Sequence, residues 1–258
     1  AWATPLMDAI DAVTASLGAV DHADDFGVRA DSPAQRELLD WLAVELIENG
    51  WRTKPLHRLI VTSNTYRQSS QYNDRFANVD PDNDLYWRWT PRRLEAEAIR
   101  DAALAVSGEL DRTAGGPSIA PYAKQGQNRR TIYLLQQRQK MPEVQRLFDG
   151  ASGVVSCGKR RTSTVPLQPL YLFNGAFMRK QAEAMAKRIA TEAGDASAKK
   201  IDRAFQLALG RPPDNAEQTK MLNYLDAVDA STTKAGQDEL FVQLCHALLN
   251  LNEFIYLD

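Results

Sequence analysis

Signals that start and stop helices recur along this chain and constrain its fold more than any other feature. The clearest set lies in residues 32–51, SPAQRELLDWLAVELIENGW. Ser32 and Gln35 have the spacing of a capping box, with Pro33 at the first helical position between them. Gly50 supplies a left-handed stop. The apolar residues between these signals recur at helical spacing: Leu39, Leu42, Ala43 and Leu46. The segment therefore predicts an amphipathic helix.

Similar patterns predict helices over residues 54–64, 90–108, 166–192, 199–228 and 238–257. The segment 199–228 is predicted to be a helical hairpin. Gly210 ends its first helix, and Asp214 with Glu217 caps the second in a variant of the capping box.

The helix predicted over residues 90–108 carries a mixed set of charges. Thr90 is its expected cap, Pro91 its first residue and Gly108 its stop. Arg93 and Arg100 are expected to lie with Glu97 on one face, which makes both arginines candidates for binding an anion or a partner.

Residues 111–165 differ from the rest because they are rich in glycine, proline and polar residues. Within them TIYLLQ, residues 131–136, is the best candidate for a strand. The sequence therefore predicts a mostly α, multi-helix globular domain with a long irregular central segment and at most a short strand pair.

The acidic and basic residues of this 258-residue chain nearly balance, and its net charge is −2. Such a balance gives no general reason to expect nucleic acid or an anionic membrane as a partner. No apolar run approaches the roughly 20 residues of a membrane-spanning helix. The sequence has two cysteines and three histidines but no CxxCH and no paired CxxC, so we expect neither covalent haem nor a metal site in this chain.

The stretch SCGKRRTSTVPLQPLYLFN, residues 156–174, is the densest cluster of basic residues. Lys159, Arg160 and Arg161 precede the helix predicted over residues 166–192 and could bind an anion, because arginine presents a fork of donors to carboxylate or phosphate. The alternative is internal pairing. At least one of Arg160 and Arg161 is then expected to form an ion pair with a carboxylate of the helix over residues 90–108. The candidate carboxylates are Glu95, Glu97 and Asp101.

Two tryptophans alternate with arginine in LYWRWTPRR, residues 85–93. Trp87 and Trp89 could stack on sugars or bases, as aromatic side chains interleaved with arginine do. They could also pack at the edge of a hydrophobic core with cation–π contacts.

Several of these motifs occur together and in order, among them GGPS, the stretch 156–174, LALGRPP and CHALLNLNEFIYLD. In this the chain resembles the planctomycete-type domain of unknown function 1553 from about residue 21 to residue 258. The resemblance implies a single helical domain over 21–258, preceded by a divergent N-terminal helix over 1–20. It supplies no activity and no catalytic residues. It implies a haem-bearing cytochrome c-type domain upstream in full-length relatives and an exported, periplasmic or cell-surface location.

Two functions are compatible with this resemblance. One is a non-catalytic helical module of an exported, cytochrome c-associated protein, which contacts the cytochrome domain, another exported protein or a glycan. The alternative is an enzyme module that acts on an acidic or sulfated polysaccharide. The sequence leaves open whether the chain is an enzyme.

Overall fold

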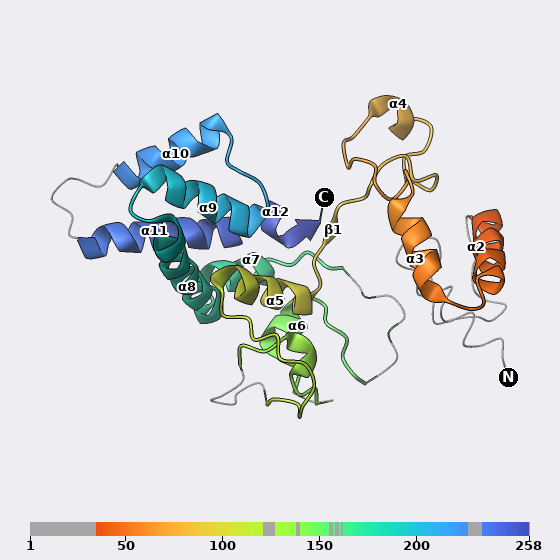
Figure 1. The fold of residues 1–258 in the computed structure, drawn as a ribbon, viewed down its shortest axis with the longest axis horizontal. Helices are drawn as coiled ribbons and strands as arrows, with labels where there is room; N and C mark the ends of the chain where they lie inside the picture. Colours follow the sequence, from red (N-terminus) through yellow and green to blue (C-terminus); the bar gives the residue numbers. More distant parts are fainter. Residues whose placement is uncertain are drawn as a thin grey trace. The chain divides into compact units, whose positions relative to one another are not determined.

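A computed structural model describes most of the chain (Figure 1). The described residues are 35–120, 127–137, 140–154, 157, 160, 162–226 and 234–257. The helix expected over residues 1–20, and the capping residues Ser32 and Pro33, lie outside them.

The described chain forms two compact units. Unit 1 contains residues 35–92 together with 154, 157 and 160, and unit 2 contains most of the remainder from residue 93 to residue 257. Each unit is described below by itself.

Unit 1 is built on a pair of helices with a small hydrophobic cluster between them. Its helices are α2 (Arg36–Glu48), α3 (Thr53–Thr62) and α4 (Asp74–Ala77). Leu42, Leu46 and Leu56 are the buried residues of the cluster. Gly50 ends α2 with a φ of 65°. The helix predicted from the apolar spacing of residues 39–46 and its glycine stop are therefore confirmed.

Unit 2 is a helical assembly around α8. Its elements are α5 (Ala96–Ser107), η1 (Thr131–Tyr133), α6 (Glu143–Leu147), α7 (Leu167–Asn174), α8 (Ala176–Ala193), α9 (Ser197–Leu209), α10 (Asn215–Asp226), α11 (Lys234–Leu249) and α12 (Asn252–Ile255). Helix α8 packs on α5, α9 and α11. The largest fully buried apolar side chains are Ile99, Leu104, Met178, Met185, Ile189, Ile201, Phe205 and Leu249. Helices thus supply the core, which confirms the predicted fold class.

The predicted strand pair forms, but not where the sequence indicated. It joins β1 (Arg92–Arg93) to β2 (Tyr256–Leu257). Residues 131–136 are not a strand: they begin with the 3-10 turn η1, followed by an isolated bridge between Ile119 and Leu134. The turn forms because the backbone amide and hydroxyl of Thr131 both donate to Asp101, each at 2.7 Å.

The start of α5 is a second correction. The helix begins at Ala96 rather than at Pro91. The preceding residues extend along the C-terminal segment instead, where the amide of Leu94 donates to the carbonyl of Ile255 at 2.7 Å. Arg93 therefore lies in a strand and does not share a helical face with Glu97 and Arg100. Gly108 ends the helix as predicted, with a φ of 80°.

The described part of segment 111–165 is irregular, as predicted. Its only helical elements are η1 and α6, and isolated bridges link Asp111 to Arg129, Ile119 to Leu134 and Gln137 to Lys140. The segment expected to continue as one helix over residues 238–257 is divided instead into α11, α12 and β2.

The hairpin of α9 and α10 has the predicted turn. Gly210 has a φ of 72°. The amide of Asp214 donates to the Glu217 carboxylate at 2.8 Å, and the amide of Glu217 donates to the Asp214 carboxylate at 2.7 Å. Arg211 binds Glu217 and also Glu253 of α12, with closest distances of 2.7 and 2.6 Å. The turn therefore also fixes the C-terminal segment.

Replacing Gly210 with valine should lower the free energy of unfolding by about 1 kcal/mol or more. A Cβ added at Gly210 would have no neighbour within 4 Å, so the cost comes from the left-handed backbone and not from a clash. Chemical denaturation measures it. Gly210→Asn is the control and should cost less, because asparagine tolerates this conformation. Equal stability of wild type and the valine variant would contradict the assignment.

The Arg211–Glu217 pair should make stability depend on pH in the acid range. The hydrogen bonds from Arg211 and from the amide of Asp214 lower the pKa of Glu217 to about 2. A carboxyl group whose pKa is lower in the folded state stabilises the fold above its unfolded pKa. This stabilisation is lost as the pH falls from about 4.5 toward about 2. Glu217→Gln should therefore flatten the acid limb of a denaturation series, whereas Glu48→Gln, at an exposed position on α2, should leave its shape unchanged.

Candidate functional site

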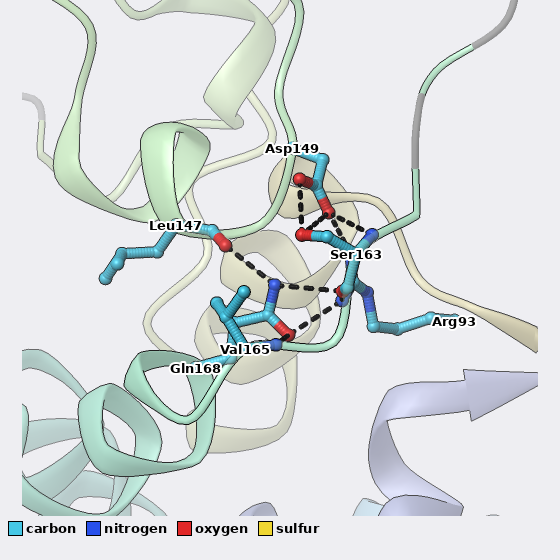
Figure 2. Close-up of polar contacts among 6 residues, drawn as sticks. All are labelled: Arg93, Leu147, Asp149, Ser163, Val165 and Gln168. Atoms are coloured by element: carbon cyan, nitrogen blue, oxygen red, sulfur yellow. Dashed lines mark hydrogen bonds and ion pairs between the residues drawn. The ribbon is translucent and has the colours of Figure 1, made fainter.

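Arg93 is the centre of a buried polar network in unit 2 (Figure 2). Its side chain is 5% exposed and binds the Asp149 carboxylate at 2.7 Å. It also donates to the side-chain carbonyl of Gln168 at 2.8 Å and to the backbone carbonyl of Ser163. We call Arg93, Asp149, Ser163 and Gln168 the arginine clasp.

Asp149 binds both Ser163 and Arg93 in the arginine clasp. The hydroxyl and the backbone amide of Ser163 donate to its carboxylate at 2.7 and 2.8 Å, and the amide donates to the same oxygen, Oδ2, as Arg93 does. Desolvation by burial raises the pKa of Asp149, but the hydrogen bonds from Ser163 and Arg93 outweigh it, so the pKa is lowered. The carboxylate is therefore ionised and neutralises the buried arginine.

Gln168 completes the clasp from the first turn of α7. Its amide donates to the carbonyl of Leu147 at 2.8 Å and to that of Ser163 at 3.1 Å (Figure 2). The arginine clasp thereby connects the chain from residue 163 into α7 to the residues that precede α5.

Arg100 forms a second buried network, on α5. Its guanidinium donates to the carbonyl of Arg129 at 3.0 Å, to the Thr131 hydroxyl at 3.2 Å and to the carbonyl of Gln127. Desolvation by burial lowers its pKa, which the neighbouring Asp101 partly opposes. The carbonyls it binds belong to the irregular segment, which is thus tied to α5.

One of the carboxylates expected to pair with the basic stretch, Asp101, belongs to this network. Asp101 accepts from Thr131 and lies 3.6 Å from Arg130. Lys159 and Arg161 lie outside the described residues. The pairing of Arg160 or Arg161 with α5 therefore stays a prediction, as does anion binding by this cluster.

Neither cysteine forms a disulfide: Cys157 is exposed and Cys245 is buried in α11. Burial raises the pKa of Cys245 to about 12. In the described ranges no three histidine, cysteine, aspartate or glutamate side chains are grouped so that they could hold a metal ion. The helices described are also too short or too polar to cross a membrane.

The two tryptophans singled out in the sequence each contact other aromatic rings of unit 1. The centre of the Trp87 ring is 5.9 Å from the centre of the Tyr72 ring and 6.0 Å from that of the Phe76 ring. The ring of Trp89 is 5.2 Å from that of Tyr66. We call these five residues, together with Arg88, the aromatic surface.

The loop that carries Trp87 and Trp89 is shaped by its own polar groups. Asn83, with a φ of 61°, donates to the carbonyl of Arg88 at 2.9 Å and accepts from its amide at 3.2 Å. The indole of Trp87 donates to the carbonyl of Asp80 at 2.8 Å. The amide of Trp89 donates to the carbonyl of Ser69 at 3.1 Å. These bonds hold the aromatic side chains in place without a surrounding core.

The aromatic surface is open to solvent. Tyr72 is 64% exposed and Phe76 49%, whereas Trp87 and Trp89 are half-buried. None of its rings belongs to the hydrophobic clusters of the described chain. Sequence reasoning found the two tryptophans but missed Tyr66, Tyr72 and Phe76, which follow no regular spacing.

Comparison with protein families identifies the chain. The model of the family described as "Protein of unknown function (DUF1553)" matches residues 15–225. The chain belongs to the DUF1553 family. Both the arginine clasp and the aromatic surface of this DUF1553 domain lie within the matched residues, and α11 and α12 lie beyond them. Comparisons with curated proteins and with solved structures gave no match.

Proposed function

We propose that this DUF1553 domain is a non-catalytic glycan-binding module, and that the aromatic surface is where it contacts sugar. The observation that carries the proposal is the exposure of Tyr72 and Phe76 around Trp87, outside any hydrophobic cluster of the described residues. Exposed apolar patches rimmed by polar residues are typical of binding sites.

Sugar rings suit such a surface because they combine apolar C–H faces with hydroxyl groups. Flat aromatic rings provide a large contact area and lose few rotamers on binding. Exposed carboxylates of the same segment, among them Asp82 and Asp84, can accept hydrogen bonds from hydroxyl groups. The surface therefore offers both of the contacts that a sugar chain needs.

The resemblance described above supports a cellular context for this activity. We propose that the domain belongs to an exported protein with a cytochrome c-type domain, which carries the haem. In that arrangement the glycan-binding module would hold the cytochrome domain at a polysaccharide-rich surface.

Replacing Tyr72 with alanine should weaken glycan binding by about tenfold or more, since ~1.4 kcal/mol of lost contact corresponds to a factor of ten. The measurement is calorimetric titration of the full chain with soluble polysaccharides, neutral and acidic. Tyr72 is exposed, and its side chain makes ring contacts but no hydrogen bond to the residues that the structure describes, so we expect its removal to leave the fold intact.

Trp41→Ala is the matched control, because Trp41 is an exposed aromatic residue of the same unit on α2. It should bind as wild type does. A wild-type chain that binds none of the polymers, or an equal loss in both variants, would contradict the proposal. Release of reducing ends from a polymer would instead support an enzyme module.

A further inference from the structure

We infer that the glycan bound by the aromatic surface carries sulfate or carboxylate groups, and that Arg88 recognises them. This inference rests on the proposed function and names the chemical class of its ligand. It comes from the position of one guanidinium group among the aromatic rings.

Arg88 lies against two rings of the aromatic surface. Its guanidinium carbon is 5.2 Å from the ring centre of Tyr72 and 5.1 Å from that of Trp87, within the range of cation–π contacts. Its Nε atom is buried and has no hydrogen-bond partner. Because Asn83 binds both the amide and the carbonyl of Arg88, the backbone that carries this side chain is held in place.

Arg88 has no carboxylate partner among the described residues, whereas at least eight other described arginines have one. Among the described arginines that lie within 4 Å of a carboxylate are Arg36, Arg93, Arg100, Arg130, Arg179, Arg188, Arg203 and Arg211. Within the described ranges Arg88 makes no ion pair and no side-chain hydrogen bond. The carboxylate of Asp80, in the same loop, accepts instead from the amides of Asp84 and Leu85 at 3.0 and 2.8 Å.

An unpaired guanidinium beside exposed aromatic rings matches an anionic sugar. The rings hold the sugar faces, while the guanidinium offers its planar fork to sulfate or carboxylate oxygens. Partial burial strengthens the interaction, because the site is less screened by water than an exposed one.

The charge balance around the site favours an acidic glycan over a nucleic acid. Residues 66–92 contain four arginines and four aspartates, so their net charge is zero. A nucleic acid carries a charge at every nucleotide and requires a basic surface along its length. A glycan with separated acidic groups can place one of them at Arg88 and present hydroxyl groups, not acidic groups, to the aspartates.

The test compares the affinities of the full chain for matched acidic and neutral polymers. Sparsely sulfated dextran against dextran tests sulfate, and carboxymethyl cellulose of low substitution against hydroxyethyl cellulose tests carboxylate. The variants are Arg88→Gln and, as a charge-matched control on exposed α3, Arg58→Gln. Arg88→Gln should weaken binding of the preferred acidic polymer by about tenfold or more, the effect of losing a charge-assisted hydrogen bond. It should weaken binding of the acidic polymer by a clearly larger factor than binding of its neutral partner, and Arg58→Gln should alter neither.

The outcomes separate this inference from the proposed function. If wild type binds acidic and neutral polymers equally and Arg88→Gln has no effect, the acidic-ligand inference is wrong, although the glycan-binding proposal stands. If Tyr72→Ala weakens binding of both members of a pair by similar factors while Arg88→Gln weakens the acidic one by a clearly larger factor, both are supported. Binding of an oligothymidine in preference to every glycan would overturn both.

Discussion

Replacing Arg93 with alanine should lower the free energy of unfolding by about 3–5 kcal/mol, the cost of removing one partner from a buried ion pair. The Arg93 side chain is 5% exposed. It forms an ion pair with Asp149 and donates hydrogen bonds to acceptors on Ser163 and Gln168. Its loss would leave a partly buried carboxylate without its cation. Chemical denaturation of the full chain gives the difference.

A double-mutant cycle distinguishes the arginine clasp from a general loss of packing. Asp149→Ala should also destabilise, and the double variant should cost clearly less than the sum of the two single changes. Arg146→Ala is the control, because Arg146 is exposed on α6, and its cost should stay within about 0.5 kcal/mol. Additive costs at Arg93 and Asp149 would show that the two residues act independently.

Replacing Arg100 with alanine should cost about 3 kcal/mol or more, because it leaves buried carbonyl groups unsatisfied. The side chain is 7% exposed and donates to backbone carbonyls of Gln127 and Arg129 and to the Thr131 hydroxyl. Denaturation measures the cost, and hydrogen exchange at the amide of Thr131 should report local loosening.

Lysine at position 100 provides the matched comparison. It keeps the charge but lacks the planar fork that reaches several acceptors at once, so its cost should be intermediate. Arg100→Lys as stable as wild type would mean that charge alone holds the irregular segment.

Local sequence signals predicted the helices whose ends are fixed by nearby residues. The turn at Gly210 and the Asp214–Glu217 capping box form as expected, because each involves residues within one turn of each other. The predicted start of α5 was wrong because distant residues, not nearby ones, determine the structure there. Thr90 and Pro91 are typical of a helix start, but the residues after them pair with Tyr256 and Leu257 at the other end of the chain.

The residues of the candidate sites also divide into those that the local sequence indicated and those that only the folded chain brings together. Arg93 and Arg100 were recognisable as arginines that need partners, but Asp149 and the carbonyl of Arg129 come from segments without regular spacing. Trp87 and Trp89 were visible as a motif. Tyr72 and Phe76 were not, because only the folded loop brings them to Trp87.

Hydrogen exchange of the full chain with and without bound polysaccharide tests the central proposal most directly, because it locates the contact. We would use each neutral or acidic polymer of the two matched pairs that wild type binds. Glycan binding by the aromatic surface predicts that protection on binding is concentrated in residues 66–90, and that Tyr72→Ala removes it. Protection confined to the arginine clasp or to other parts of unit 2, with none in residues 66–90, would contradict the proposal.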